Sequence, residues 1–260
     1  MDLGLDGTVA LVTGARGNIG AATCAALQRE GVHVIASDIG VDESAATADG
    51  LEWRALNVTS EADWSGVIAQ IEATHGRLDI LVNNAGIAPM DRIDAMPLAD
   101  FRRAFEINVY GVFLGTQAAA AVMAKSGTLR EGGSAIINIA SGAADKPAAF
   151  SAAYCSTKAA VRMFTRATAL EFSALGYPIR VNSVHPGAVE SDMMDAIYAR
   201  YSELTGMSVA DLNAAVVKGH PMGRLVKPDE VADAVVFMAS TAARYSHAAA
   251  LHVDGGNANT

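Results

Sequence analysis

The chain is poor in the residues that mark several classes of protein. Its 260 residues include only two cysteines, Cys24 and Cys155, which is too few for a disulfide framework or a cysteine metal site and fits a reducing cytoplasm. Lysine and arginine number 19 against 28 acidic residues, with no basic run. The resulting net charge of −9 argues against nucleic acid or an anionic membrane as a partner. No cationic stretch precedes an apolar one at the start, so we expect no signal peptide.

Long hydrophobic runs are scarce as well. Residues 107–124 carry no charge and approach the length that spans a membrane. The run contains Asn108, Tyr110, Thr116 and Gln117, and much of the rest is alanine and glycine. We interpret it as a helix buried within the protein or between subunits. A structural membrane protein built around this run is an alternative that solubility without detergent would dismiss.

Apolar residues make up 51% of the chain, and short β-branched runs alternate with longer helical patterns. We predict strands at 8–13, 33–37, 52–56, 78–83, 134–140, 179–184 and 250–254, and helices at 18–30, 61–75, 98–125, 151–175 and 228–239. This alternation predicts an α/β fold, with a Rossmann-type doubly wound parallel sheet in one domain over 1–260. Residues 192–220 break the rhythm, and we predict an insertion of one or two helices that binds substrate.

A glycine-rich turn follows the first predicted strand. It runs from Gly14 through Arg16, Gly17, Asn18 and Ile19 to Gly20. Its glycines would let the backbone approach a pyrophosphate at the positive end of the next helix. Glycines also punctuate ordinary loops, so this motif is weak when taken alone.

The next predicted strand leads to Asp38, 18 residues beyond Gly20. A carboxylate there can accept both ribose hydroxyls of a dinucleotide and would repel a 2′-phosphate, which favours NAD over NADP. Arg16 is the competing signal, because a guanidinium in the turn could bind that phosphate. We weigh Asp38 more heavily and expect NAD, although Asp38 could also simply begin a loop.

Two more turns follow the third and fourth predicted strands. The Asn57 carbonyl and the Val58 N–H could contact the edge of adenine, but an asparagine in a turn before a helix is an equal alternative. Asn84, Ala85 and Gly86 are small residues at a point where a backbone must pass close to a ribose. Taken singly, this second turn would be ordinary.

Tyr154 and Lys158 lie four residues apart in an alanine-rich helix and therefore share a face. A phenol with a pKa near ~10 is a poor base at neutral pH, and an adjacent ammonium favours the phenolate. We expect an acid–base pair, with a snorkelling lysine beside a surface tyrosine as the alternative. Ser141 follows a strand and could reach the same oxygen. Asn108 interrupts an apolar helix, where its amide needs partners.

Together these motifs resemble the single-domain branch of the short-chain dehydrogenase/reductase family over nearly the whole chain. The resemblance rests on TGARGNIG (13–20), NNAG (83–86), Asn108, Ser141, YCSTK (154–158) and HPGAVES (185–191). It implies that Tyr154 is the general acid/base, that Lys158 activates it and anchors the ribose, and that Ser141 holds the substrate oxygen. Asn108 would support a water chain from Lys158 to solvent.

The resemblance also assigns the segment after the sixth predicted strand to the nicotinamide. The residues expected there are Pro186, Gly187, Val189 and Ser191, the last in place of the more usual threonine. Two further departures are Asn18 at the second-glycine position and Asn57 where an aspartate is more usual. The first of these shifts the expected approach of the pyrophosphate by one residue.

The implied reaction is hydride transfer between NAD and a secondary alcohol or ketone. The expected substrate segments 87–92, 142–150 and 192–220 are mostly apolar, so we expect a small, hydrophobic, cyclic or steroid-like substrate. A 3-oxoacyl-thioester reductase of the same fold and a catalytically silent NAD-binding regulator are alternatives. The histidines are too scattered in sequence to indicate a metal site. Family members are commonly tetramers packed through the helices that correspond to 98–125 and 151–175, so we expect a homo-oligomer.

Overall fold

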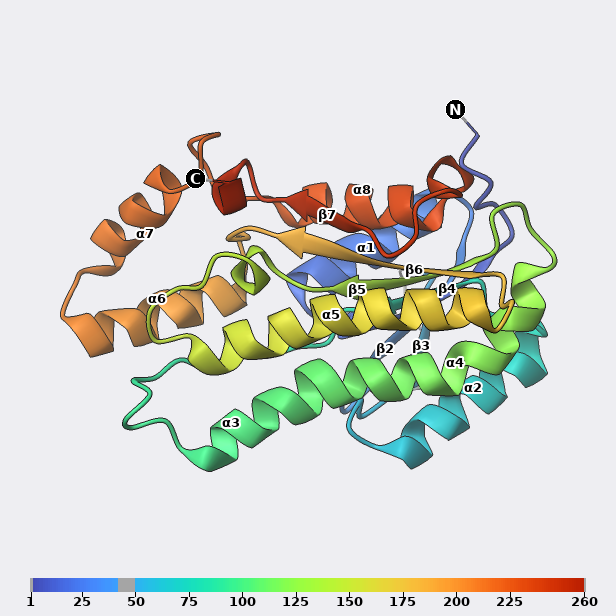
Figure 1. The fold of residues 1–260 in the computed structure, drawn as a ribbon, viewed down its shortest axis with the longest axis horizontal. Coiled ribbons are helices and arrows are strands. Elements are labelled where there is room, and N and C mark those ends of the chain that lie inside the picture. The colour runs from blue at the N-terminus through green and yellow to red at the C-terminus, as the bar shows by residue number, and fades with distance from the viewer. Residues whose placement is uncertain (1, 42–49, 260) are drawn as a thin grey trace.

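Seven parallel strands form the middle layer of the protein, and the computed structural model describes residues 2–41 and 50–259. Their order across the sheet is β3-β2-β1-β4-β5-β6-β7, which is a doubly wound topology that reverses direction at β1 (Figure 1). The strands are β1 (Val9–Thr13), β2 (His33–Asp38), β3 (Glu52–Ala55), β4 (Ile80–Asn83), β5 (Ser134–Ile139), β6 (Ile179–Pro186) and β7 (Ala250–Val253). All seven strands predicted from the sequence are present, with ends that differ by at most two residues.

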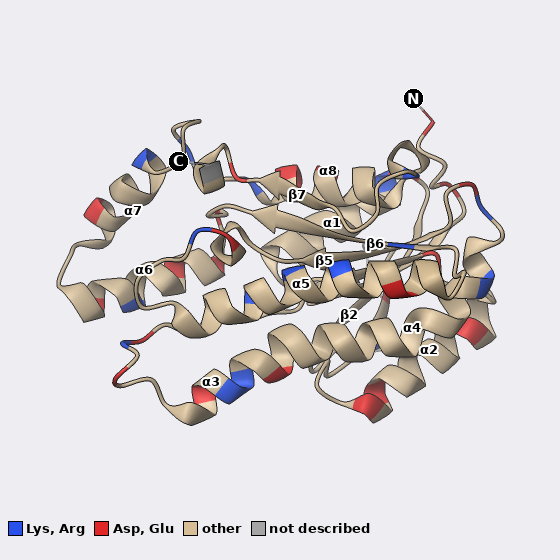
Figure 2. Ribbon diagram, viewed as in Figure 1, with Lys and Arg blue, Asp and Glu red and all other residues tan. Residues whose placement is uncertain are grey.

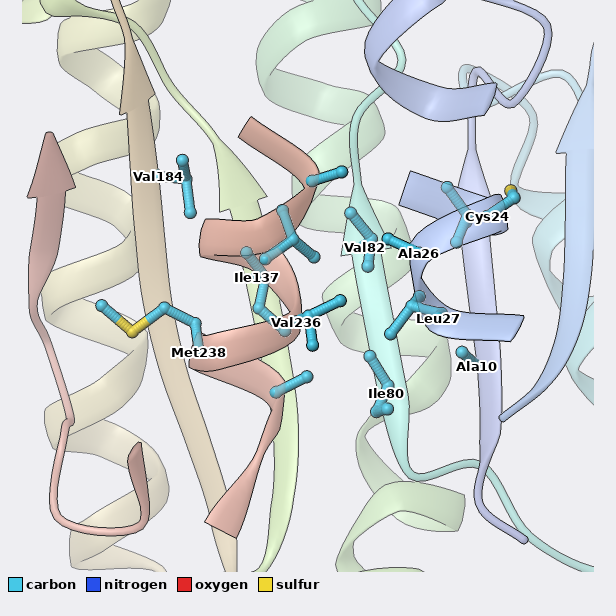
Figure 3. Packing of buried hydrophobic residues seen from close by; sticks show 14 of the residues in the cluster. Ala10, Cys24, Ala26, Leu27, Ile80, Val82, Ile137, Val184, Val236 and Met238 are labelled. Atoms are coloured by element: carbon cyan, nitrogen blue, oxygen red, sulfur yellow. The ribbon is translucent and has the colours of Figure 1, made fainter. Parts of the chain in front are cut away.

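Two helices, α1 (Asn18–Arg29) and α8 (Pro228–Ala239), cover one face of the sheet and pack on each other. Alternate strand residues such as Ala10 and Val82 point toward them and meet Leu27 of α1 and Val236 of α8 (Figure 3). Burying a leucine or valine side chain of this kind stabilises the fold by about 1.5–3 kcal/mol. This packing holds the start of α1 directly above the carboxyl end of β1.

The other face is covered by α2 (Glu61–His75), α4 (Gly111–Gly127) and α5 (Ala152–Ala174). The intervening strand residues, among them Leu11 and Ile136, point to this side and pack against Trp64, Met123 and Phe172. Because both faces are covered, the central strands β1, β4 and β5 are buried at every position and not only at alternate residues, as the sequence pattern indicated.

The long apolar helix predicted at 98–125 runs from Leu98 to Gly127 and is interrupted in the middle. It consists of α3 (Leu98–Phe105), a π-helical turn at Glu106–Tyr110, and α4. By length and composition it could cross a membrane, but half of its most apolar stretch is buried against the rest of the protein. It is therefore a core helix, as we expected.

Residues 192–220 form two helices, α6 (Asp192–Thr205) and α7 (Val209–Lys218), as the sequence indicated. Figure 1 shows both helices beyond the carboxyl end of β6, at the left of the view. Ser191 caps α6 by accepting from Met194 N, and Ser208 caps α7 by accepting from Asp211 N. They overhang the edge of the sheet at which the predicted site residues gather.

Candidate functional site

The glycine turn after β1 has the shape of an anion-binding loop. Gly14 has φ +64, and a Cβ there would lie 2.8 Å from Ala85 Cα. At Gly20 an added Cβ would come within 2.2 Å of the Gly14 carbonyl oxygen. Gly17 is the N-cap of α1 and has no side chain that could cap the first-turn amides. These amides therefore remain available for a phosphate at the positive end of the helix, so the turn fits a dinucleotide.

Asn18, at the position where a glycine is more usual, has a structural partner. Its Oδ1 accepts a hydrogen bond from Asp192 N at 3.2 Å. This bond joins the first residue of α1 to the first residue of α6. The side chain thus links the phosphate turn to the overhanging helices, a contact that no sequence spacing indicated.

Asn84, after β4, is tied to the glycine turn. Its Nδ2 donates to the carbonyl oxygens of Thr13 and Gly14 at 2.9 and 3.0 Å. In return, Thr13 Oγ1 accepts from the N–H groups of Asn84 and Ala85 at 3.0 and 3.1 Å. The two turns that were predicted to hold one dinucleotide are therefore a single hydrogen-bonded unit. Thr13 was missed as a positioning residue although it begins the quoted TGARGNIG motif.

The Asp38 carboxylate lies at the end of β2, beside the same turn. Oδ2 accepts from Arg16 N at 3.0 Å and Oδ1 accepts from Ile39 N at 2.8 Å. The Arg16 side chain turns toward the Gly40 carbonyl oxygen, 3.5 Å away. Two backbone N–H groups therefore fix the carboxylate beside the turn where a ribose is expected.

At the predicted adenine end of the site, the Asn57 side chain forms hydrogen bonds within its own turn. Its Oδ1 accepts from both Thr59 N and Thr59 Oγ1, at 3.1 and 2.9 Å. These two bonds close the turn that precedes α2. The Val58 carbonyl oxygen accepts from Trp64 Nε1 at 3.0 Å. The alternative of a turn asparagine therefore accounts for the side chain at position 57, and its amide oxygen is already satisfied.

Ser141 and Tyr154 meet at the carboxyl end of β5. The Ser141 hydroxyl lies near enough to the Tyr154 hydroxyl to lower its pKa, and Ser141 Oγ accepts from Ala143 N at 3.1 Å. Tyr154 is half-buried, yet desolvation around its hydroxyl raises the pKa of the phenol, against a smaller lowering by Ser141. In the protein alone the pKa of Tyr154 is therefore raised and not lowered, because desolvation outweighs the lowering by Ser141.

Lys158 is buried one turn after Tyr154. Its Nζ donates to the Ile139 carbonyl oxygen at 2.7 Å and lies 5.7 Å from the centroid of the Tyr154 ring. Burial lowers the pKa of Lys158 to about 8. A Cβ at Gly86 would lie 3.6 Å from this Nζ, so the ammonium also faces the turn after β4. The predicted acid–base pair is brought together, and the surface alternative fails.

Asn108 is buried in the π-helical turn, and its amide is fully used. Oδ1 accepts from Ile87 N at 2.9 Å, while Nδ2 donates to Ile87 O at 2.8 Å and to Thr157 Oγ1 at 3.0 Å. A side chain that holds the loop after β4 and α5 at once explains the break in the helix. Thr157 lies inside the quoted YCSTK motif, but its role was not foreseen.

The segment after β6 is positioned by a buried histidine. His220 Nδ1 donates to Val216 O at 2.8 Å, so its Nε2 can accept from Ala188 N at 3.2 Å. A Cβ at Gly187 would lie 2.8 Å from this Nε2. Val189 bridges to Val226. The sequence identified Pro186, Gly187 and Val189 but not the histidine that supports them.

The Ser191 hydroxyl, which we expected near the nicotinamide, forms hydrogen bonds with the backbone. Its hydroxyl donates to Val189 O at 3.0 Å and accepts from Met194 N at 3.2 Å. It therefore fixes the start of α6 close to the predicted nicotinamide segment.

Our interpretation that the histidines are scattered is wrong for four of them, which meet as two pairs, and one of these pairs lies near Ser141. His185 and His252 stack with ring centroids 4.9 Å apart, next to Asp145. Their closest nitrogens are 3.5 and 3.8 Å from Asp145 Oδ2, and Arg162 pairs with Oδ1. Burial, then His252 and Arg162, lower the pKa of His185 to about 4, so this ring is neutral at physiological pH. Parallel pairing of β6 and β7 sets His185 opposite His252, which sequence distance concealed.

The predicted substrate segments meet at the same edge. Asp91 N donates to Phe150 O at 3.0 Å, and the Asp91 carboxylate pairs with Arg200 of α6 at 2.9 Å. Phe150 has φ +62 and packs edge-on against Tyr201 at 5.3 Å. A phenylalanine held in this conformation is a strained residue of the kind that collects at binding sites.

The site agrees with what comparison with known proteins finds. The family profile described as "Enoyl-(Acyl carrier protein) reductase" matches residues 14–258. The chain is 34% identical over 257 residues to galactitol 2-dehydrogenase of Agrobacterium fabrum, covering 97% of this chain and 98% of that protein. It is 37% identical over 255 residues to 3-beta-hydroxysteroid dehydrogenase of Comamonas testosteroni, covering 96% and 95%.

A solved structure with a similar fold is the actinorhodin polyketide ketoreductase with NADPH. The TM-score is 0.88 at 31% identity, over 98% of this chain and 99% of that chain. The resemblance inferred from the motifs is thus confirmed over nearly the full length. The chain belongs to the short-chain dehydrogenase/reductase family, whose dehydrogenases act on CH–OH groups with a nicotinamide cofactor.

Proposed function

We propose that the protein transfers a hydride between NAD and a hydrophobic, cyclic or steroid-like secondary alcohol or ketone, with Tyr154 as general acid/base. The observation that carries this proposal is the meeting of the Ser141 hydroxyl, the Tyr154 hydroxyl and the buried Lys158 ammonium at one end of β5. A silent binding protein has no need to bury a lysine whose pKa falls to about 8.

In the oxidative direction the alcohol proton passes to the Tyr154 phenolate. A nicotinamide held beside Pro186, Gly187 and Val189 would supply the acceptor for the hydride of the carbinol carbon. Ser141 Oγ stays on the substrate oxygen as a hydrogen-bond donor and orients it. Lys158 keeps a positive charge beside the phenol, and this charge favours the phenolate, whereas desolvation raises the pKa of Tyr154. The reverse sequence protonates a ketone oxygen from Tyr154.

NAD rather than NADP is the proposed cofactor, on the strength of Asp38. Its carboxylate is held by two backbone N–H groups at the end of β2, and a 2′-phosphate placed there would meet a fixed negative charge. Arg16 is directed at the Gly40 carbonyl oxygen, away from the Asp38 oxygens. The relatives do not decide the matter, since the ketoreductase structure holds NADPH.

An apolar substrate is proposed from the segments that overhang the site. Met194 and Ile197 of α6 are partly buried, and Tyr201 of the same helix packs edge-on against Phe150. Arg200 is neutralised by Asp91 and Glu203, which leaves it poorly suited to bind a substrate carboxylate. The 3-beta-hydroxysteroid dehydrogenase relative supports a ring alcohol, whereas the galactitol enzyme is the reason to include polyols in a screen.

We further propose a tetramer in the cytoplasm. Apolar side chains that are exposed in one chain lie on α4, α5 and the π-helical turn, namely Tyr110, Phe113, Met163, Leu170 and Leu175. Figure 2 shows α4 almost free of charged residues. Helices of this kind suit contact with other copies of the chain.

A spectrophotometric screen tests the proposal. Purified protein is assayed with cyclic, steroidal and polyhydric alcohols and their ketones, each with NAD(H) and NADP(H). We expect turnover of cyclic alcohols with a higher kcat/KM for NAD. Equal or better efficiency with NADP would overturn the cofactor assignment, and turnover of carboxylated or phosphorylated compounds alone would overturn the substrate class.

Tyr154→Phe is expected to lower kcat by roughly 10²–10⁴-fold, since it removes the proton carrier. Binding of NADH, followed by its fluorescence, should be retained because the ring remains. The matched control is Tyr177→Phe, which removes a hydroxyl from a partly exposed tyrosine next to Phe172. Near-full activity in Tyr154→Phe would remove the assignment.

A further inference from the structure

A second group of polar side chains lies at the opposite edge of the sheet from Ser141 and the glycine turn. His33 is the first residue of β2, Glu52 the first of β3, and His75 the last of α2. The strands are parallel, so these residues belong to the amino edge of the sheet, whereas Gly14, Ser141 and Pro186 belong to the carboxyl edge. The proposed reaction makes no use of this group.

Sheet register and helix periodicity bring the three side chains together. Ile35 pairs with Glu52, and His33 lies two residues before Ile35 on the same face of β2. His75 continues the stripe of α2 that packs on the sheet, whose members are spaced by three or four residues. That stripe is Trp64, Ile68, Ile71 and His75. The arrangement is therefore fixed by the core and not by a loose surface contact.

Both imidazoles converge on one carboxylate oxygen. His33 Nε2 lies 2.8 Å and His75 Nε2 3.0 Å from Glu52 Oε2. The two rings are 4.4 Å apart between centroids, and all three candidate ligand atoms lie within 4.8 Å of one another. A four-coordinate zinc ion with bonds near 2.1 Å separates its ligands by about 3.4 Å, so each histidine–glutamate pair needs to open by only roughly 0.5 Å.

Arg54 orients the Glu52 carboxylate. The guanidinium binds Glu52 Oε1 at 2.5 Å, which turns Oε2 toward the histidines. The His33 side chain is 47% exposed, which leaves a path for an ion and room for a water ligand.

We propose that His33 Nε2, His75 Nε2 and Glu52 Oε2 form a binding site for a divalent transition-metal ion of the zinc type. Imidazole nitrogen and carboxylate oxygen are ligands such ions take in proteins, and water completes the tetrahedron. Each ring then carries its proton on Nδ1. Arg54 is the outer partner that holds the carboxylate. The ion ties β2, β3 and α2 together and stabilises the fold without touching the catalytic edge.

The histidines near Ser141 form a weaker candidate for the same ion. Arg162 is paired with Asp145, and both Arg162 and Lys158 act on His185 as positive charges. A dication at that place would face two cations, whereas Arg54 is the one cation that touches the amino-edge group among the described residues. The two groups can be separated by mutation.

The test is metal binding to the full-length protein, produced without a polyhistidine tag and stripped with chelator. Zn²⁺ is titrated calorimetrically, and Co²⁺ is used as a spectroscopic probe because a tetrahedral site gives it intense visible bands. We expect one ion per chain, and a melting temperature raised by roughly 5–10 °C when the free ion is about 100 times its dissociation constant. Turnover is not the readout, so failure here leaves the proposed reaction untouched.

Three variants and one control decide the location. His33→Ala, His75→Gln and Glu52→Gln should each lose the Co²⁺ bands and the zinc-dependent shift in melting temperature. His252→Ala removes a histidine from the other group and should keep both. His33 is the most exposed ligand, so His33→Ala remains informative if His75→Gln folds poorly. Absence of binding in the unmodified protein, or binding lost in His252→Ala and kept in His33→Ala, would overturn the proposal.

Discussion

Two buried cations, Lys158 and Arg180, lie at opposite edges of the sheet and differ in how many hydrogen bonds the chain offers them. Lys158 lies beside the carboxyl end of β5, while Arg180 is the second residue of β6. Burial lowers the pKa of both, of Lys158 to about 8 and of Arg180, with help from Arg130, to about 10. Both are almost completely removed from solvent.

Their hydrogen bonds differ. The Arg180 guanidinium donates to five carbonyl oxygens around the end of α8, those of Gly132, Met238, Ala239, Ser240 and Ala243. Among the described residues, the Lys158 ammonium has one hydrogen-bond acceptor, Ile139 O, for its three donors. A cation that stabilises a fold is saturated by the chain, whereas one that serves a reaction keeps donors for a ligand.

The largest effect that separates the two cations should be on turnover. Lys158→Met is expected to lower kcat by roughly 10²–10⁴-fold, because the charge that favours the Tyr154 phenolate is lost. Steady-state kinetics with a substrate from the screen measure it. Lys125→Met, which removes an exposed ammonium paired with Glu72, is the control and should leave kcat unchanged. If kcat of Lys158→Met stays within a few-fold of the parent value, Lys158 does not differ from Arg180 in serving the reaction.

Arg180→Met should act on stability instead. It leaves carbonyl oxygens at the end of α8 buried without donors, so we expect the free energy of unfolding to fall by about 3–5 kcal/mol. Urea denaturation followed by circular dichroism measures the fall. The kcat of the folded protein should be unchanged. Arg244→Met is the exposed control and should shift the midpoint little. A fall in kcat at full folding would show that Arg180 also serves the site.

The pH dependence of the unfolding free energy gives a second test of the buried Lys158 ammonium. Below pH 8 the ammonium is charged in the folded protein, and the cost of its burial is fully present. Between pH 8 and 10.5 the folded protein releases this proton while the unfolded chain keeps it, so the cost falls as pH rises. Lys158→Met should therefore be the more stable protein at pH 7, by up to roughly 3 kcal/mol, and lose that advantage by pH 10.5.

Paired urea titrations across this pH range test that sign. Lys158→Arg is the control, because arginine stays charged over this pH range. The parent gains stability as its lysine loses the proton, so the difference in unfolding free energy between the parent and Lys158→Arg should grow with pH. A pH-independent difference between the parent and Lys158→Met would mean that the lysine is not desolvated in solution.

The smallest expected effect is at Gly86, which faces the ammonium. An alanine Cβ there would lie 3.2 Å from Asn108 Oδ1 and 3.6 Å from Lys158 Nζ, so the Asn108 amide must shift slightly. We expect a loss of about 1 kcal/mol in stability and a raised KM for NAD. Gly66→Ala is the matched control, since an added Cβ in α2 meets nothing within 4 Å and should be neutral or stabilising. An unchanged KM in Gly86→Ala would separate this turn from the cofactor.

Much of the fold was predictable because its signals are local. Each strand is a short apolar run, and its limits were found to within two residues. The halves of the catalytic pair, Tyr154 and Lys158, are four residues apart on one helix, so their meeting required only the helical period. The start of α2 is local in the same way, because Ser60 caps it by accepting from Asp63 N.

The residues that sequence reasoning missed depend on contacts between distant segments. His220 supports Ala188 from 32 residues away, and Thr157 meets Asn108 from 49 residues away. The raised pKa of Tyr154 was missed for the same reason, since desolvation is set by what packs around the hydroxyl and not by the neighbour along the helix.

The sequence by itself therefore determined the order of strands and helices along the chain, the glycine turn and the choice of residues proposed to react, because periodicity and short motifs act within a few residues. Only the tertiary structure decided which polar atoms are satisfied, which cations are desolvated, and which histidines meet. It placed His185 opposite His252, and His33 and His75 on Glu52, because the lateral register of parallel strands and the packing of α2 on the sheet are properties of the assembled layers.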